Sequence, residues 1–160
     1  MYSYSTRSLN NLKGVHPDVV KVFMEAIKES PYDFIITWGL RTAQQQYSLW
    51  CQGRTVKGKK YPGIVVTGCD GYARKSNHQM KKDGYGHAVD IVLCGHKDAN
   101  GKYVKYTTTK EMYDDKKMRE MGAYIKGVAY KLGIPIEWGG DWKKPYDPPH
   151  FQLKSSLGYK

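Results

Sequence analysis

Two segments that lie far apart in the sequence carry the residue types that bind a catalytic metal. The first, SNHQMKKDGYGHAVDI at 76–91, contains two histidines and an aspartate. The second, EWGGDWKKPYDPPHFQL at 137–153, places Asp147 and His150 on either side of a Pro-Pro pair. Proline fixes φ and lacks a backbone donor, so this acid-x-x-His unit is stiff. We expect it to hold the His150 imidazole on a metal ion and the Asp147 carboxylate where it can act as a general base.

The first segment must supply the other ligands, because a catalytic zinc ion takes three protein ligands and leaves one position for water. Residues 88–94 form an apolar run that predicts a strand. Side chains alternate between the two faces of a strand, so Asp90 and His87 point to opposite faces. This parity favours His78, which reaches in from the preceding loop, and leaves His87 as the reserve candidate. A carboxylate in an apolar strand also needs a partner. We therefore predict that His78, Asp90 and His150 bind the metal.

Taken in order, these pieces resemble one enzyme superfamily. Ser76-x-His78, Gly86-x-Ala88-x-Asp90, Trp138-Gly-Gly-Asp-Trp142 and Asp147-x-x-His150 are similar to the zinc peptidases of the D-alanyl-D-alanine carboxypeptidase and dipeptidase superfamily. Within it, the chain most resembles the L-alanyl-D-glutamate peptidases of bacteriophage endolysins, and so do SLNNLKGVHPDVV at 8–20 and WGLRTAQQQYSLW at 38–50. One departure is the run 79–85 between His78 and Gly86, which is longer than in that group and which we interpret as a loop insertion.

The resemblance implies a function and a role for each residue. The substrate would be the peptide stem of peptidoglycan, cut at the L-alanyl-D-glutamate bond, and the result would be lysis of the bacterial cell wall. Zn²⁺ would be the cofactor, and Asp147 would take a proton from water and return it to the leaving amine. Arg41 would hold the oxyanion or a substrate carboxylate, with an ordinary ion pair as its alternative. Ser76 would bind substrate or orient its neighbours.

Three other functions remain open from the sequence. A D,D- or L,D-carboxypeptidase that trims the stem would carry the same motifs, because pocket shape decides which bond is cut. Some relatives of this fold are signalling modules that keep zinc without cleaving the wall, although the presence of Asp147 argues against that. A basic nucleic-acid binder is the third.

Charge and composition limit the partners. The net charge is +11, from 26 Lys and Arg against 15 Asp and Glu. Such a surface attracts polyanions, and we expect it to favour an anionic cell wall or lipopolysaccharide. The basic residues are dispersed and accompany no nucleic-acid recognition signature, so no specific nucleic acid is expected. No apolar run approaches the about 20 residues of a membrane span, and the N-terminal residues lack a signal peptide's apolar stretch. Together with the resemblance to phage endolysins, this implies that the protein waits in the host cytoplasm until a separate membrane pore releases it to the periplasm and wall.

The elements that must position these residues follow from apolar periodicity and turn residues. We predict helices at 17–30, 42–52 and 109–132, strands at 34–38, 88–94, 134–138 and 150–153, and an irregular excursion at 53–75. Asp98 to Gly101 predicts a turn, in a hairpin if the strands continue. At 160 residues the chain predicts a single domain, 1–160, which the resemblance implies is a zinc peptidase, and we expect a monomer. The fold class is α+β, a small, mainly antiparallel sheet flanked by helices, and the resemblance implies the zinc D-Ala-D-Ala peptidase-like (hedgehog-like) fold.

Overall fold

A mainly antiparallel sheet forms the centre of the molecule. The computed structural model describes residues 1–154, so the end of the predicted domain 1–160 lies outside the described residues. The strands β1 (Asp33–Trp38), β4 (Ala88–Lys97), β7 (His150–Leu153) and β6 (Ile136–Trp138) are neighbours in that order, and β5 (Tyr103–Lys105) also pairs with β4. Every pairing in this sheet is antiparallel. The α+β class predicted from the sequence is confirmed.

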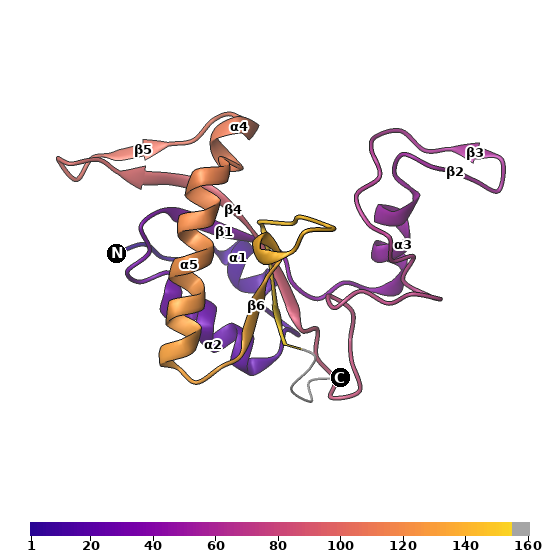
Figure 1. The fold of residues 1–160 in the computed structure, drawn as a ribbon, viewed down its shortest axis with the longest axis horizontal. Helices are drawn as coiled ribbons and strands as arrows, with labels where there is room; N and C mark the ends of the chain where they lie inside the picture. Colours follow the sequence, from indigo (N-terminus) through magenta and orange to yellow (C-terminus); the bar gives the residue numbers. More distant parts are fainter. Residues whose placement is uncertain (155–160) are drawn as a thin grey trace.

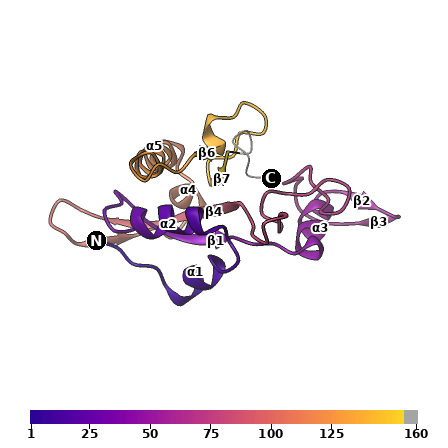
Figure 2. The same ribbon diagram turned by 90° about the horizontal axis from the view of Figure 1, so that it is seen from below.

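Helices cover this sheet and close the core. The helix α2 (Pro17–Ala26) packs against α5 (Asp115–Lys131), α5 also contacts β6, and α1 (Thr6–Asn11) contacts β1 (Figures 1 and 2). Phe23 on α2 is fully buried, and its ring meets Phe34 of β1 and Phe151 of β7 edge-on at centroid distances of 6.3 and 5.6 Å. None of the helices within residues 1–154 is long and apolar enough to cross a membrane.

Two helix predictions need correction, and one helix was missed. The helix predicted at 17–30 ends at Ala26, because the chain turns there and the Ser30 hydroxyl donates to the Tyr32 carbonyl oxygen at 2.6 Å. The helix predicted at 109–132 is two helices, α4 (Thr109–Met112) and α5. The break follows from Asp114, whose side chain accepts from the Lys117 backbone N–H and so begins a new helix. The short helix α1 was not predicted.

The strand predictions differ mainly at their ends. The strand predicted at 88–94 continues to Lys97 and forms a hairpin with β5 across the predicted turn. The strand predicted at 134–138 begins only at Ile136, and His150–Leu153 has the predicted bounds. The predicted excursion 53–75 contains an unpredicted two-stranded hairpin, β2 (Thr55–Val56) with β3 (Lys59–Lys60).

A separate arm stands beside the sheet. It consists of α3 (Ala43–Cys51) and the β2–β3 hairpin, which project together from one end of the molecule (right in Figure 1). Thr42 begins α3 with a capping box, in which its side chain and that of Gln45 each accept from the other's backbone N–H. The Arg54 guanidinium donates to the Thr67 carbonyl oxygen at 3.0 Å and so ties the returning chain to this arm.

Candidate active site

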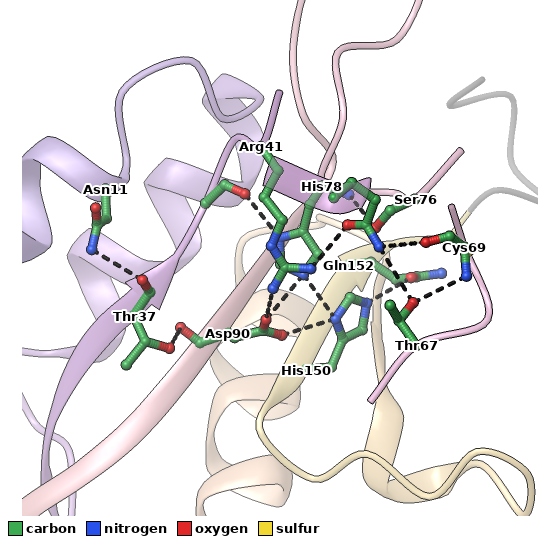
Figure 3. A network of polar contacts seen from close by, with 12 residues as sticks. Asn11, Thr37, Arg41, Thr67, Cys69, Ser76, His78, Asp90, His150 and Gln152 are labelled. Atoms are coloured by element: carbon green, nitrogen blue, oxygen red, sulfur yellow. Dashed lines mark hydrogen bonds and ion pairs between the residues drawn. The ribbon is translucent and has the colours of Figure 1, made fainter. Parts of the chain in front are cut away.

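Strand register brings Asp90 and His150 together. The two residues are direct partners in the antiparallel pairing of β4 with β7. Directly opposite residues share a face of the sheet and have neighbouring Cβ atoms. The His150 Nδ1 atom therefore lies 3.0 Å from Asp90 Oδ1 (Figure 3). The odd-numbered residues Val89, Ile91 and Leu93 belong to the hydrophobic core instead, as the strand alternation predicts.

His78 reaches the same point from the loop before β4. Its carbonyl oxygen accepts from the Arg41 backbone N–H at 2.8 Å, which fixes the loop against the end of β1. Its Nδ1 lies 2.8 Å from the Gly39 carbonyl oxygen, an atom that only accepts, so Nδ1 carries the proton. Its Nε2 then points inward, 3.2 Å from Asp90 Oδ2 and 3.2 Å from His150 Nδ1.

The outer nitrogen of His150 is also held by the protein. Its Nε2 lies 2.8 Å from Gln152 Oε1, so Nε2 donates and Nδ1 faces inward. Gln152 is fixed in turn, because it accepts from Asn77 Nδ2 at 2.8 Å and donates to Glu137 Oε2 at 3.3 Å. Metal-bound histidines are commonly oriented by such contacts. Sequence reasoning missed Gln152 and Glu137, although the i, i+2 spacing of His150 and Gln152 on one strand could have indicated the first.

The resulting cluster fits a metal ion. One ligand atom from each of His78, Asp90 and His150 lies within 4.8 Å of the others. Both imidazoles donate outward to neutral oxygens, so two nitrogen lone pairs and a carboxylate converge on one point. A cation at that point would be bound by all three of these groups. Two imidazoles and one carboxylate are a donor set that zinc accepts, with a fourth position left open.

Burial and charge set the protonation of these groups. Burial lowers the pKa of His78, which favours the neutral form that binds metals. Burial alone would raise the pKa of Asp90, but the charges and hydrogen bonds of the two histidines hold it well below its usual range. Burial alone would lower the pKa of His150, but its hydrogen bond and ion pair with Asp90 outweigh burial and raise this pKa. Asp90 is therefore ionised at neutral pH.

Arg41 lies beside this cluster and contacts a predicted ligand. Its Nη2 donates to Asp90 Oδ2 at 2.7 Å, its Nη1 donates to Gln46 Oε1 at 3.2 Å, and its guanidinium stacks over the Trp38 ring at 4.8 Å. Its Nε is buried and has no hydrogen-bond partner within the described residues. The ion pair between Arg41 and Asp90 is largely buried and is not an ordinary surface ion pair. Arg41 therefore orients the Asp90 carboxylate.

Asp147 and Ser76 line the same pocket, whose volume is about 500 Å³. The Asp147 backbone N–H donates to the Gly139 carbonyl oxygen at 3.0 Å, and a Cβ at position 139 would lie 2.3 Å from the Asp147 carbonyl oxygen. This close approach explains why glycine stands there. Burial and then the Asp90 charge raise the pKa of Asp147. The Ser76 hydroxyl accepts from the His78 backbone N–H at 3.2 Å, so Ser76 orients its neighbour.

His87 lies away from the cluster, and the insertion after His78 is a turn that closes on itself. The His87 ring is buried, and its Nε2 lies 2.6 Å from Asp83 Oδ2. The Lys81 backbone N–H donates to the Tyr85 carbonyl oxygen at 2.9 Å, and Gly84 supplies the positive φ of the turn. The insertion therefore leaves His78 free to face Asp90.

The α+β fold and this cluster together define a protein with a central antiparallel sheet and a His-Asp-His site that could bind a metal ion. A model of the phage L-alanyl-D-glutamate peptidase family matches residues 1–152. The chain therefore belongs to the phage L-alanyl-D-glutamate peptidase family, which confirms the resemblance and the enzyme class predicted from the sequence. It is also similar to the peptidoglycan L-alanyl-D-glutamate endopeptidase CwlK of Bacillus subtilis, with 31% identity over 145 residues, 87% of this chain and 73% of CwlK. Among solved structures, it matches the L-Ala D-Glu endopeptidase ChiX of Serratia marcescens, with a TM-score of 0.63, 28% identity and 97% and 92% of the two chains covered.

Proposed function

We propose that the protein is a zinc-dependent endopeptidase that hydrolyses the L-alanyl-D-glutamate bond of the peptidoglycan stem. The family match supports the reaction. The observation that carries the metal assignment is the convergence of His78 Nε2, His150 Nδ1 and the Asp90 carboxylate. The other nitrogen of each imidazole is hydrogen-bonded to an oxygen of the protein, so the converging nitrogens are available to a metal ion. Zinc in such a site acts as a Lewis acid that polarises a carbonyl oxygen and acidifies water.

Each residue of the site has a proposed role in metal binding, proton transfer or positioning. His78, Asp90 and His150 hold the ion, and Gln152 fixes the tautomer of His150. Asp147 lines the pocket with a raised pKa, which strengthens it as a base, so it accepts a proton from water and returns it to the leaving amine. Arg41 holds Asp90 and presents a positive charge to the oxygen on which charge develops. Ser76 keeps the His78 backbone in place.

The test combines metal content with the identity of the bond that is cut. We expect wild-type protein to contain one equivalent of zinc and to release the stem after L-Ala from isolated peptidoglycan, as read by mass spectrometry. His78→Ala should lose zinc and cleavage, whereas the control His87→Ala should keep both. Release of free D-Ala instead would favour the carboxypeptidase. Cleavage by a protein that binds no zinc would contradict the metal assignment.

The basic surface has a proposed role in reaching the substrate. With a net charge of +11, the protein should associate with an anionic wall or lipopolysaccharide after its release from the host cytoplasm. Clearance of permeabilised Gram-negative cells should then fall steeply with added salt, because salt screens surface charges. Salt-independent clearance would oppose this role.

A further inference from the structure

A second pocket adjoins the catalytic pocket. This side pocket, of about 410 Å³, lies between the start of α3 and the loop at 71–80. Arg41 and Lys75 line both pockets. A ligand that occupied both would therefore cross this shared rim without leaving the surface of the protein. The proposed base Asp147 and the proposed metal ligand His150 line the catalytic pocket but not the side pocket. The side pocket can therefore bind a ligand but does not carry the reacting groups.

The lining of the side pocket combines an apolar floor with an exposed aromatic ring. Leu40, Ala43 and Met80 supply apolar surface, and Tyr72 stands at the edge with 59% of its surface exposed. Apolar surface gathered with an aromatic ring around a pocket is a feature of binding sites. Lys75, also exposed, provides a donor at the rim.

The Tyr72 ring is held in place by the arm. It meets the Tyr47 ring edge-on at 5.9 Å, and Tyr47 stacks on Trp50 at 5.6 Å with 27° between the planes. The Tyr72 backbone N–H donates to Asp70 Oδ1 at 3.1 Å, which fixes the turn that carries the ring. Because the ring contacts Tyr47 and is still largely exposed, it can stack against a flat ligand at little cost in side-chain entropy.

This combination suits a sugar ring. The C–H face of a pyranose is apolar and packs on an aromatic ring, while its hydroxyl and acetamido oxygens accept from cationic side chains. The side pocket offers a ring, an apolar floor and the donor Lys75 in one place.

The chemistry of the substrate places a sugar close to the bond that is cut. In peptidoglycan, L-Ala is joined directly to the lactyl group of N-acetylmuramic acid. One extended residue spans at most about 3.6 Å, so the sugar lies close to the catalytic pocket whenever the bond after L-Ala is in it. We propose that the side pocket, with Tyr72 as its platform, binds the N-acetylmuramyl sugar that carries the stem. This inference rests on the proposed function, because it takes the bond after L-Ala as the one cut.

A binding measurement tests the proposal without turnover. We expect calorimetry to show that N-acetylmuramyl-L-alanine binds wild-type protein more tightly than N-acetyl-L-alanine, by about three- to tenfold, the range of one aromatic stacking contact. Tyr72→Ala should remove this difference and Tyr72→Phe should keep it. Tyr130→Ala, which removes a tyrosine that is 87% exposed on α5, is the matched control and should have no effect. Equal binding of both compounds to wild-type protein would overturn the proposal, even if the enzyme proved inactive.

Kinetics then separates this proposal from the proposed function. Tyr72→Ala should lower kcat/KM about three- to tenfold on a muramyl-linked stem and leave kcat/KM on the free stem peptide unchanged. Loss on both substrates would mean that the side pocket holds peptide rather than sugar, which would also overturn the proposal. Failure of wild-type protein to cut either substrate would count against the proposed function, and the binding experiment would still decide on the sugar.

Discussion

Asp147, the proposed general base, carries a cost for the stability of the fold. Burial and the Asp90 charge both penalise its ionised form, so its pKa in the folded protein is raised. A carboxyl group with a raised pKa favours folding when protonated. That contribution is fully present below the pKa of the unfolded chain and is lost as the pH rises through the folded pKa. At neutral pH, the charged Asp147 therefore lowers the stability of the metal-free protein.

Replacing Asp147 by asparagine should separate the two effects. Asp147→Asn removes the proton acceptor, so we expect kcat/KM to fall by about 10²- to 10⁴-fold while zinc stays bound. The same change should raise the melting temperature of metal-free protein at pH 7, on the order of 2 °C, and the gain should shrink as the pH approaches the ordinary aspartate range. Thermal denaturation at several pH values checks this. Asp141→Asn, which removes an exposed ion pair with Lys126, is the control and should change both readouts little.

Three of the candidate site residues could be predicted from the sequence because each carries a strong local signal. Asp147 and His150 flank two prolines, and Asp90 interrupts an apolar strand. Glu137 could not be found, because its contact with Gln152 depends on the register of β6 against β7, which no local pattern sets. Its role became visible only once the two strands were placed side by side.

At the scale of elements, β7 carries both a predicted ligand and the residue that orients it. Gln152→Leu would leave His150 Nε2 without its acceptor and the ring free to change tautomer. We expect zinc affinity to fall about 10- to 100-fold, as for other residues that orient a ligand. Competition with a fluorescent chelator measures this without turnover. Gln44→Leu is a matched control on the exposed side of α3. Unchanged affinity in Gln152→Leu would show that β7 alone orients the ring.

Two glycines in α5 should respond to the same substitution in opposite directions. A Cβ at Gly122 would lie 2.4 Å from the Trp138 ring, whereas a Cβ at Gly127 meets nothing within 4 Å. Gly127→Ala should stabilise the protein by up to about 1 kcal/mol through helix propensity. Gly122→Ala should destabilise it by about 1–3 kcal/mol, because the helix must move away from β6. Urea unfolding checks both. Stabilisation by both changes would mean that α5 packs less tightly on Trp138.

Element boundaries were less predictable than element types. Apolar residues recur at helical spacing from Met118 onward, and no proline or glycine interrupts residues 109–117, so the sequence signals merged two helices into one. The signal for the break was present, since Asp114 stands where an N-cap would. Apolar periodicity says which face is buried, but side-chain to backbone hydrogen bonds decide where a helix begins.

At the scale of the whole molecule, the candidate site joins three parts of the fold. His78 comes from a loop held against the end of β1, Asp90 from the central strand β4, and His150 from β7. Asp90 is placed between two imidazoles whose inward nitrogens lie 3.2 Å apart. Without a cation, at least one of these nitrogens must carry a proton, so a metal ion would replace hydrogen bonds within this buried cluster.

Zinc should therefore stabilise the fold as a whole. At a free zinc concentration 100-fold above Kd, binding adds about 2.7 kcal/mol. For a protein of this size, that corresponds to a rise in melting temperature of about 5–10 °C. Differential scanning calorimetry with and without a chelator measures the rise. His78→Ala should abolish it, whereas His87→Ala should show the same rise from a lower starting temperature, because it loses the buried contact with Asp83 but none of the three ligands. A full rise in His78→Ala would place the ion elsewhere, and the ligand set would have to be redrawn.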